Sequence, residues 1–209
     1  MNKGIFISFE GPDGSGKTTQ IKRLSDYCRN NGFEIVATRE PGGTPISEKI
    51  RNIILENSNA EMSDTAEALL FAASRAQHVE QLIKPALEAG KIVICDRFMD
   101  SSIAYQGYGR ELGDGVRMIN EFAVQGIQPD MTFFMDLDPE IGKKRVLAEG
   151  EPDRLENEAL LFHRKVYEGY LKLSEIYRER YIRIDANRAV DEISDEIIGI
   201  FRKYVAERA

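Results

Sequence analysis

The chain has 209 residues, 42% of them hydrophobic and 30% charged, which is ordinary for a globular protein and predicts one domain over residues 1–209. The formal net charge of −7 argues against a nucleic-acid partner, because such binding relies on a broad basic surface. The start of the chain lacks a signal-peptide pattern and no stretch reaches the ~20 apolar residues of a membrane span, so we expect a cytoplasmic protein with no membrane partner.

Short apolar runs alternate with amphipathic segments along the chain. The apolar runs predict strands at residues 5–10, 34–38, 92–95, 132–137 and 181–185. The segments between them predict helices that begin at residues 17, 44–45 and 138–139, and helices over residues 64–83, 100–106, 116–124, 157–178 and 190–206. Pro85 is expected to kink the helix over 64–83 or to restart it. We therefore expect an α/β fold with three layers, in which helices cover both faces of a five-stranded parallel sheet.

The segment between the first strand and the first helix, GPDGSGKT, fits the phosphate-binding pattern G-x-x-x-x-G-K-[ST]. Glycines let backbone N–H groups turn toward phosphate oxygens, and the helix N-terminus adds partial positive charge. Lys17 can reach the β- and γ-phosphates, and the hydroxyl of Thr18 suits Mg²⁺. With this loop between strand and helix, the expected α/β fold is of the P-loop NTPase type. The residues expected to bind ATP are Gly11, Pro12, Asp13, Gly14, Ser15, Gly16, Lys17 and Thr18.

GTPases, motor ATPases and small-molecule kinases share this loop, so other features must separate them. The late strands end in DLD at 136–138 and DAN at 185–187, and neither supplies the N/T-K-x-D motif that reads guanine. The third strand ends in Asp96-Arg97, so Asp96 can orient magnesium or its water, but no general-base Glu follows it. A kinase needs no such base, because its nucleophile is already bound, and the pattern favours a kinase.

A kinase also needs a second anion site that faces the P-loop. Arg39 follows the second strand and Arg97 follows the third, at the carboxyl ends where α/β sheets bind ligands. The fork of an arginine matches phosphate oxygens in a bidentate way. A single arginine after a strand is usually a surface residue, but two at one edge beside a P-loop predict a phosphate site.

Seven segments in one order along the chain resemble a known family. They are GPDGSGKTT at 11–19, TREPGGT at 38–44, LLFAASRAQH at 69–78, DRF at 96–98, AYQG at 104–107, PD at 129–130 and DRLE at 153–156. With them the chain resembles the thymidylate kinases over nearly its whole length. The resemblance implies a nucleoside monophosphate kinase that transfers the γ-phosphate of ATP to dTMP, giving dTDP and ADP for dTTP synthesis, with Mg²⁺ as cofactor.

The resemblance also implies residues that hold the acceptor base and sugar. Phe71 would stack on the thymine ring, and Arg75, on the same helix face, would donate to O4, which excludes cytosine. Ser102 and Gln106 would contact the base, and Tyr105 would lie near the sugar C2′ and reject a ribose hydroxyl. Without the resemblance, Phe71 would be a helix-core residue, and Ser102 and Gln106 would be capping or exposed residues.

Around the phosphates, the resemblance implies that Arg39 and Arg97 hold the phosphate of dTMP. Asp13 would bind the sugar 3′-hydroxyl or organise the donor phosphates. Glu10 would help through magnesium-bound water or serve as a buried structural residue. The DRF segment departs from the family, in which Tyr or His is more common at the position of Phe98.

Residues 150–157, GEPDRLEN, form a polar segment between two helices and are a candidate lid. One branch of the family carries a second basic residue in the P-loop, and the other supplies an arginine from the lid. Lys17 is the only basic residue of this P-loop, so the chain resembles the second, bacterial-type branch, with Arg154 as its lid arginine. The expected catalytic residues are Asp13, Lys17, Arg97 and Arg154.

The family forms homodimers through helices packed side by side, and the apolar stripe on residues 64–83 is compatible with this or with core packing. Arg145 and the loop 186–189 are candidates for adenine contacts. Two alternatives to a dTMP kinase stay open. One is a kinase of another nucleoside monophosphate or of a nucleoside, and the other is a nucleotide-binding module that hydrolyses ATP slowly.

Overall fold

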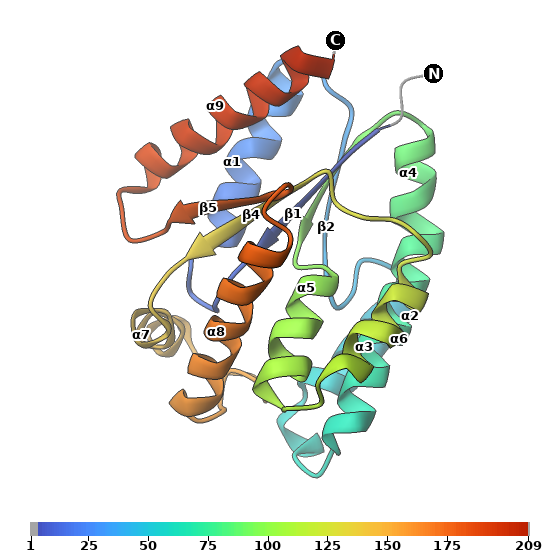
Figure 1. Ribbon diagram of the computed structural model, residues 1–209, viewed down its shortest axis with the longest axis vertical. Coiled ribbons are helices and arrows are strands. Elements are labelled where there is room, and N and C mark those ends of the chain that lie inside the picture. Colours follow the sequence, from blue (N-terminus) through green and yellow to red (C-terminus); the bar gives the residue numbers. More distant parts are fainter. Residues whose placement is uncertain (1–3, 209) are drawn as a thin grey trace.

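The computed structural model describes residues 4–208, which contain one five-stranded sheet (Figure 1). The strands are β1 (Ile5–Glu10), β2 (Ile35–Arg39), β3 (Ile92–Asp96), β4 (Met131–Asp136) and β5 (Tyr181–Asp185). They lie in the order β2-β3-β1-β4-β5, and every neighbouring pair is parallel. The predicted α/β fold class is confirmed, and each predicted strand lies within one residue of the observed one at both ends.

Helices cover both faces of the sheet and make two separate cores. On one face α1 (Lys17–Asn30) and α9 (Val190–Arg208) lie side by side, and their apolar residues pack on the sheet (Figure 1). The other face carries α3 (Asp64–His78), α4 (Lys84–Glu88), α5 (Met99–Ser102) and α8 (Leu160–Ile176), and α2 (Pro45–Leu55) and α6 (Asp114–Ala123) pack against α3. A short 3₁₀ turn, Asn57–Asn59, follows α2, and α7 (Pro139–Glu149) follows β4.

Two segments leave regular α-helical geometry. The predicted helix 64–83 consists of α3 and a π-helical turn, Val79–Ile83. The turn continues into α4 at Lys84 without leaving helical backbone angles, and Pro85 lies in the first turn of α4. The predicted helix 100–106 consists of α5 and a second π-helical turn, Ile103–Gly109. Such widened turns occur frequently at functional sites, and this one carries Tyr105 and Gln106.

Side-chain caps fix where several helices begin. The hydroxyl of Thr44 accepts a hydrogen bond from the backbone N–H of Ser47 at 3.3 Å, and the carboxylate of Asp138 accepts one from the N–H of Glu140 at 2.7 Å. Proline follows each of these caps, as the sequence predicts. Helix α8 begins at Leu160 rather than at 157, so the irregular segment before it is longer than expected.

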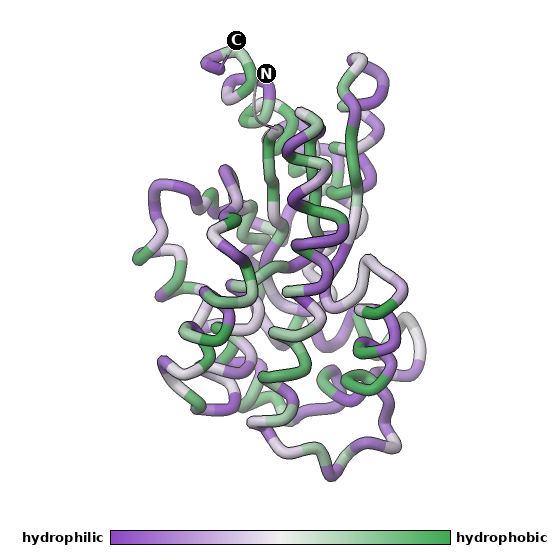
Figure 2. The backbone as a smooth tube through the Cα atoms, turned by 90° about the vertical axis from the view of Figure 1, so that its right-hand side faces the viewer, coloured by the Kyte–Doolittle hydropathy of each residue, from purple (hydrophilic) through white to green (hydrophobic). Residues whose placement is uncertain are grey.

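Hydrophobic and hydrophilic residues alternate along the helices, as expected for helices that cover a sheet on one side only (Figure 2). Among residues 4–208, none of the helices is both long enough and apolar enough to span a bilayer. Strands β1, β2 and β3 are in register and end at the same edge of the sheet, with Phe9 and Arg39 both opposite Asp96. This carboxyl edge is where parallel α/β sheets bind ligands.

Candidate active site

The P-loop leaves β1 and enters α1 in a conformation that needs glycine. Gly16 is the N-cap of α1 and has φ of 85°. Gly14 has φ of 70° and lies against α7, so that a Cβ atom at this position would come within 2.4 Å of the carbonyl oxygen of Gly142. Glycine is therefore required at position 14 both for its backbone angle and for the close approach of α7.

Lys17 lies at the start of α1, and its ammonium group is buried inside the loop. It donates to the carbonyl oxygens of Gly11 at 3.1 Å and Pro12 at 2.8 Å. Burial, and then the positive charge of Arg97, lower the pKa of Lys17 to about 8. A poorly solvated cation at a helix N-terminus is a strong site for phosphate oxygens.

The carboxylate of Asp13 joins the P-loop to the end of β3. It accepts hydrogen bonds from Arg97 Nη2 at 2.5 Å and from the hydroxyl of Tyr105 at 2.7 Å. Burial opposes its ionisation, but the charges of Arg97 and Lys17 outweigh burial and lower the pKa of Asp13 to about 2. The structure therefore brings Asp13, Lys17 and Arg97, three of the four predicted catalytic residues, into one cluster.

Arg97 holds its position through a strained backbone and four hydrogen bonds. Its φ of 70° lies in the left-handed region, which is uncommon for a residue other than glycine and is enriched at functional sites. Nη1 donates to Ser101 Oγ at 3.1 Å and to the hydroxyl of Tyr170 at 3.0 Å, while Nη2 donates to Asp13 and to the hydroxyl of Tyr105 at 3.1 Å. The guanidinium therefore has a fixed orientation before any substrate binds.

Glu10 supports the same cluster from inside the protein. Its carboxylate is fully buried and accepts hydrogen bonds from Ser101 Oγ at 2.6 Å and from Tyr170 at 3.0 Å, the two hydroxyls that also contact Arg97. Burial, and then the negative charge of Asp100, raise the pKa of Glu10 to about 7. Glu10 therefore positions the groups around Arg97, which favours the structural one of its two predicted roles.

Phe98 points its ring into the core, where it meets Phe6 edge-on at 4.9 Å between ring centroids. Its polar contacts use only the backbone. The N–H donates to Glu10 Oε1 at 2.7 Å, and the carbonyl oxygen accepts from Arg75 Nη2 at 3.0 Å. The hydrogen bonds that Phe98 makes therefore do not depend on a polar side chain at this position.

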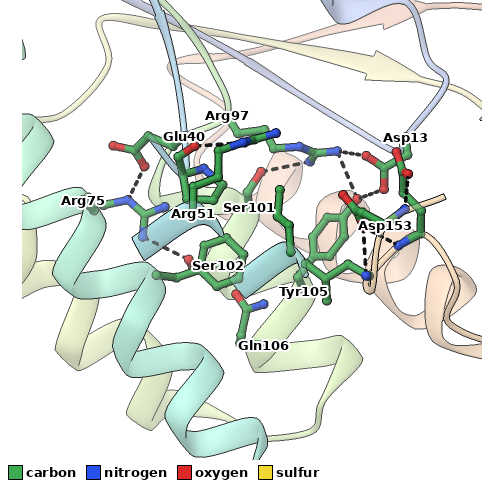
Figure 3. A pocket seen from close by; sticks show the side chains of 15 residues that line it. Asp13, Glu40, Arg51, Arg75, Arg97, Ser101, Ser102, Tyr105, Gln106 and Asp153 are labelled. Atoms are coloured by element: carbon green, nitrogen blue, oxygen red, sulfur yellow. Dashed lines mark hydrogen bonds and ion pairs between the residues drawn. The ribbon is translucent and has the colours of Figure 1, made fainter. Parts of the chain in front are cut away.

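A cavity of about 140 Å³ opens between the P-loop, α3 and the π-helical turn Ile103–Gly109 (Figure 3). Arg75, Ser102 and Gln106 lie on one side of it and Asp13 on the other, with Arg51 and Arg97 between them (Figure 3). Phe71 also lines the cavity, and the predicted lid contributes Asp153, Leu155 and Glu156. Phe71, Arg75, Ser102, Tyr105 and Gln106, the predicted base and sugar contacts, all line this one cavity.

Arg75 is almost fully buried and is held rigidly. Nε donates to Glu40 Oε2 at 2.7 Å, Nη1 donates to Ser102 Oγ at 2.9 Å and to Asn120 Oδ1, and Nη2 donates to the carbonyl of Phe98. Protein groups among residues 4–208 therefore occupy four of its five N–H donors. The remaining donor can bind a keto oxygen in the cavity.

Gln106 offers the opposite hydrogen-bonding group. Its amide nitrogen donates to Glu67 Oε1 at 2.9 Å. Its carbonyl oxygen is buried and has no hydrogen-bond partner within residues 4–208. A buried acceptor of this kind is costly unless a ligand or water satisfies it, so Gln106 marks a place for an N–H group.

Arg39 does not line the cavity. Its Nη2 donates to Glu48 Oε2 at 2.9 Å, and its side chain is 49% exposed beside an open groove along β2. Arg51 of α2 lines the cavity instead and donates to the carbonyl of Pro41 at 2.9 Å. Burial, and then the charge of Arg39, lower the pKa of Arg51. A phosphate bound here would relieve both penalties, so Arg51 is a phosphate-binding candidate that the sequence reasoning missed.

Arg154 is the one predicted catalytic residue that lies outside the P-loop cluster. Its Nε donates to the carbonyl of Ile54 at 2.7 Å and its Nη2 to Glu67 Oε2 at 2.6 Å, and only 8% of its side chain is exposed. Both contacts lie on the side of α2 and α3. The structure therefore places the guanidinium of Arg154 against α2 and α3 rather than in the P-loop cluster.

The predicted magnesium ligands are next to each other. Thr18 Oγ1 donates to Asp96 Oδ2 at 3.2 Å. Mg²⁺ prefers oxygen ligands and is usually held by one or two protein groups together with phosphate oxygens and water. The hydroxyl and the carboxylate beside the P-loop fit such a nucleotide-bound ion.

Comparison with known proteins identifies the family. The sequence model of the family described as thymidylate kinase matches residues 9–197. The chain belongs to the thymidylate kinase family. It is 52% identical to the thymidylate kinase of Clostridium novyi over 205 residues, which is 97% of this chain and 100% of the relative. A Geobacillus thymidylate kinase is 53% identical over 194 residues, or 91% of this chain and 92% of the relative.

The same family is found among solved structures. A crystal structure of thymidylate kinase from Ehrlichia chaffeensis superposes with a TM-score of 0.79 at 33% sequence identity and covers 95% of this chain and 99% of that one. The expected resemblance to thymidylate kinases is therefore confirmed.

In this thymidylate kinase fold, part of the site lies in local motifs, and tertiary packing brings in further residues that no motif contains. Ser101 and Tyr170 contact Arg97, and Glu67 contacts Gln106 and Arg154. Tyr170 is 73 residues from Arg97 along the chain, so no local spacing could reveal the contact. Glu67 could have been noticed in the sequence, because it is a charged residue in the apolar stripe of a predicted helix and such a residue needs a buried partner.

Proposed function

We propose that this chain transfers the γ-phosphate of ATP to dTMP, giving dTDP and ADP. Membership of the thymidylate kinase family makes it a phosphotransferase. Two groups in the same cavity carry the identity of the acceptor: one N–H donor of Arg75 and the carbonyl oxygen of Gln106, neither of which has a partner within residues 4–208. Thymine presents a keto oxygen at C4 and an N–H at N3, whereas cytosine presents an amino group and a bare nitrogen, so both contacts favour thymine.

The rest of the acceptor fits the remaining lining. Phe71 offers a flat apolar surface for the ring, and Tyr105 lies between the base end and the P-loop, where the sugar would sit. Arg51 and Arg97 would hold the 5′-phosphate at the P-loop end. Arg39 would join them only by leaving Glu48, so its predicted phosphate contact depends on that ion pair breaking.

The donor site follows from the P-loop. Gly11–Thr18 would bind the phosphates of ATP, with Lys17 on the transferred group, and Thr18 and Asp96 would hold Mg²⁺, which supplies positive charge at the phosphate oxygens. Phosphoryl transfer has a loose transition state, so the contribution of the protein is positioning and charge stabilisation. Asp13 keeps Arg97 aligned between the two phosphate sites.

Residues 150–157 act as a lid in this proposal. Asp153, Leu155 and Glu156 line the cavity, so this segment limits access of water to the acceptor. Arg154 would complete the charge stabilisation if it leaves Glu67 during the reaction. We expect Arg154→Ala to lower kcat more than it raises KM for dTMP, and an unchanged kcat would remove Arg154 from the catalytic set.

We also propose that the active form is a homodimer. The exposed apolar residues Leu69, Met118 and Phe122 gather with alanines of α3 and α6 into one groove. A second copy of this chain would cover these residues, and the same helix α3 carries Phe71 and Arg75 into the cavity.

A coupled assay of ADP release with ATP and magnesium tests the proposed reaction. The acceptors to compare are dTMP, dUMP, dCMP, the ribose analogue of dTMP, AMP and thymidine. Fast release with dTMP, well ahead of dCMP and of the ribose analogue, is the expected result. Equal rates across the panel would indicate another acceptor class, and release that ignores the acceptor would indicate simple ATP hydrolysis.

A further inference from the structure

Glu67 of α3 is a buried carboxylate that lies outside the P-loop cluster. It has no exposed surface, and four N–H donors converge on its two oxygens. Oε1 accepts from Gln106 Nε2 at 2.9 Å and from Arg110 Nε at 3.3 Å. Oε2 accepts from Arg110 Nη2 at 3.1 Å and from Arg154 Nη2 at 2.6 Å. A carboxylate that is removed from water is retained only with such compensation.

This carboxylate decides which way the amide of Gln106 faces. An ionised carboxylate only accepts hydrogen bonds, so the amide NH₂ of Gln106 must point at Glu67 and the amide oxygen must point away. A flipped amide would place its oxygen against Oε1 and would lose the hydrogen bond. Burial opposes the ionisation of Glu67, but hydrogen bonds from Arg110 and Gln106 outweigh burial and lower its pKa, so Glu67 stays ionised at neutral pH.

We infer that Glu67 is a positioning residue for recognition of the acceptor base, because it fixes Gln106 with its carbonyl oxygen toward the cavity. The inference rests on the proposed function and names the part of the acceptor that the site reads, an imide N–H such as N3–H of thymine. Glu67 itself does not line the cavity and acts through Gln106.

The same carboxylate ties the lid to this recognition site. Arg154 comes from the lid and pairs directly with Glu67. Arg110 also pairs with Glu158 at 2.5 Å, so Glu67 holds residue 158 to α3 through Arg110. Leu155 and Glu156 lie between these two anchors and line the cavity. One buried charge therefore holds both the group that reads the base and the segment that covers it.

The test compares dTMP with 3-deaza-dTMP, an analogue in which C–H replaces N3–H and the oxygen at C4 becomes a hydroxyl. The change at C4 is the same for wild type and variants, so a difference in preference between them reports the contact with Gln106. The wild-type enzyme is expected to prefer dTMP in kcat/KM by roughly a hundredfold, because the analogue leaves the buried oxygen of Gln106 unpaired. Glu67→Gln removes the charge that orients Gln106, so the preference is expected to fall to about tenfold or less. Asp64→Asn is the matched control, because Asp64 also pairs with Arg110, at 3.3 Å, but is exposed and does not contact Gln106.

A second variant guards against failure of Glu67→Gln to fold. Glu67→Asp keeps the negative charge between Arg110 and Arg154 but withdraws the carboxylate from Gln106 by about one methylene, so it should also reduce the preference. If both variants lower kcat/KM for dTMP and for the analogue equally, Glu67 is only structural and the inference fails. The inference also fails if wild-type enzyme uses both nucleotides equally well, whereas no transfer to dTMP at all would overturn the proposed function itself.

Discussion

At the scale of single residues, Arg97 is the group that connects the P-loop with the acceptor cavity. Its Nη2 contacts Asp13 of the P-loop and its Nη1 contacts Ser101 and Tyr170, and the guanidinium lies 4.9 Å from the ring centroid of Tyr105. A lysine has the charge but not the planar fork, so it cannot make these contacts together. The geometry, more than the charge, is therefore what the site requires of Arg97.

We predict that Arg97→Lys lowers kcat/KM for dTMP by about a hundredfold, with a smaller effect on KM for ATP. Steady-state kinetics with each substrate varied in turn measures both parameters. Arg29→Lys, on the exposed surface of α1, serves as the control and should leave kinetics unchanged. A loss of less than about threefold in Arg97→Lys would show that positive charge alone suffices.

Glu10 gives a prediction about pH and stability. The pKa of Glu10 in the folded protein is about 7 and lies above the ordinary glutamate pKa of 4.5, so the folded state binds more protons than the unfolded state between these values. The free energy of unfolding that Glu10 contributes therefore falls as pH rises from about 4.5 to 7. The charged and titratable groups that interact with Glu10 include Asp100, Arg97, Lys17, Arg180, Cys95, Tyr170 and Tyr181.

Glu10→Gln removes this titration, so we predict that the variant gains stability relative to wild type as pH rises, by up to roughly 3 kcal/mol between pH 5 and 8. Urea unfolding at several pH values measures the difference. Glu80→Gln, an exposed change on the helical segment after α3, should show a constant difference across the same range. A constant difference for Glu10→Gln as well would contradict the raised pKa.

Local motifs predict only part of such a site. The P-loop and Arg97 could be placed from local patterns in the sequence, because each lies at the end of a predicted strand. The residues of α3 and the π-helical turn could be placed only through the resemblance to the thymidylate kinases. Arg51 could not, since its place at the cavity depends on how the loop 39–44 packs against α3 and α2. Arg39 shows the opposite case. Its place at the end of β2 fixes the position of its backbone but not the partner of its long side chain, which pairs with Glu48.

At the scale of elements, α5 is fastened to the beginning of β5 by a buried ion pair. Arg180 donates to both oxygens of Asp100, at 2.7 and 2.8 Å, and to Thr132 of β4 at 2.6 Å. Asp100 is fully buried and Arg180 is 14% exposed. Because α5 lies between Arg97 and the π-helical turn, this pair helps to hold the whole acceptor side against the sheet.

We predict that Asp100→Asn destabilises the fold by about 3 kcal/mol, because it leaves the Arg180 charge without its buried partner. Chemical denaturation at neutral pH measures the change. Asp26→Asn, which breaks an exposed pair with Arg29, is the control and should change stability by less than ~0.5 kcal/mol. An equally small effect of Asp100→Asn would mean that the mutant amide fully replaces the carboxylate.

Sequence patterns predicted the strands better than the helices. Strands here are short apolar runs between breakers, so their ends were predicted within one residue. The π-helical turns at 79–83 and 103–109 could not be predicted, because an extra residue in a helical turn is stabilised by tertiary contacts and leaves no composition signal. This matters for function, since the second turn sets the direction of Tyr105 and Gln106.

At the scale of the whole molecule, the groove on α3 and α6 is the clearest candidate for a contact with a second copy. Phe122 is 87% exposed, Met118 is 61% exposed and Leu69 is 53% exposed, and alanines of α3 line the floor between them. Large apolar side chains gathered in one patch are uncommon on a monomer surface. Burying them against the same patch of another chain would give a twofold-symmetric interface.

We predict that wild-type protein is a dimer in solution and that Phe122→Glu together with Met118→Glu makes it a monomer, because four carboxylates would meet across the twofold axis without partners. Light scattering after size-exclusion chromatography gives the mass directly. Ile176→Glu, a matched change at a 62% exposed apolar residue of α8, should leave the dimer intact. A wild-type protein that elutes as a monomer at micromolar concentration would contradict the prediction, and a dimer that survives both substitutions would place the interface on another face.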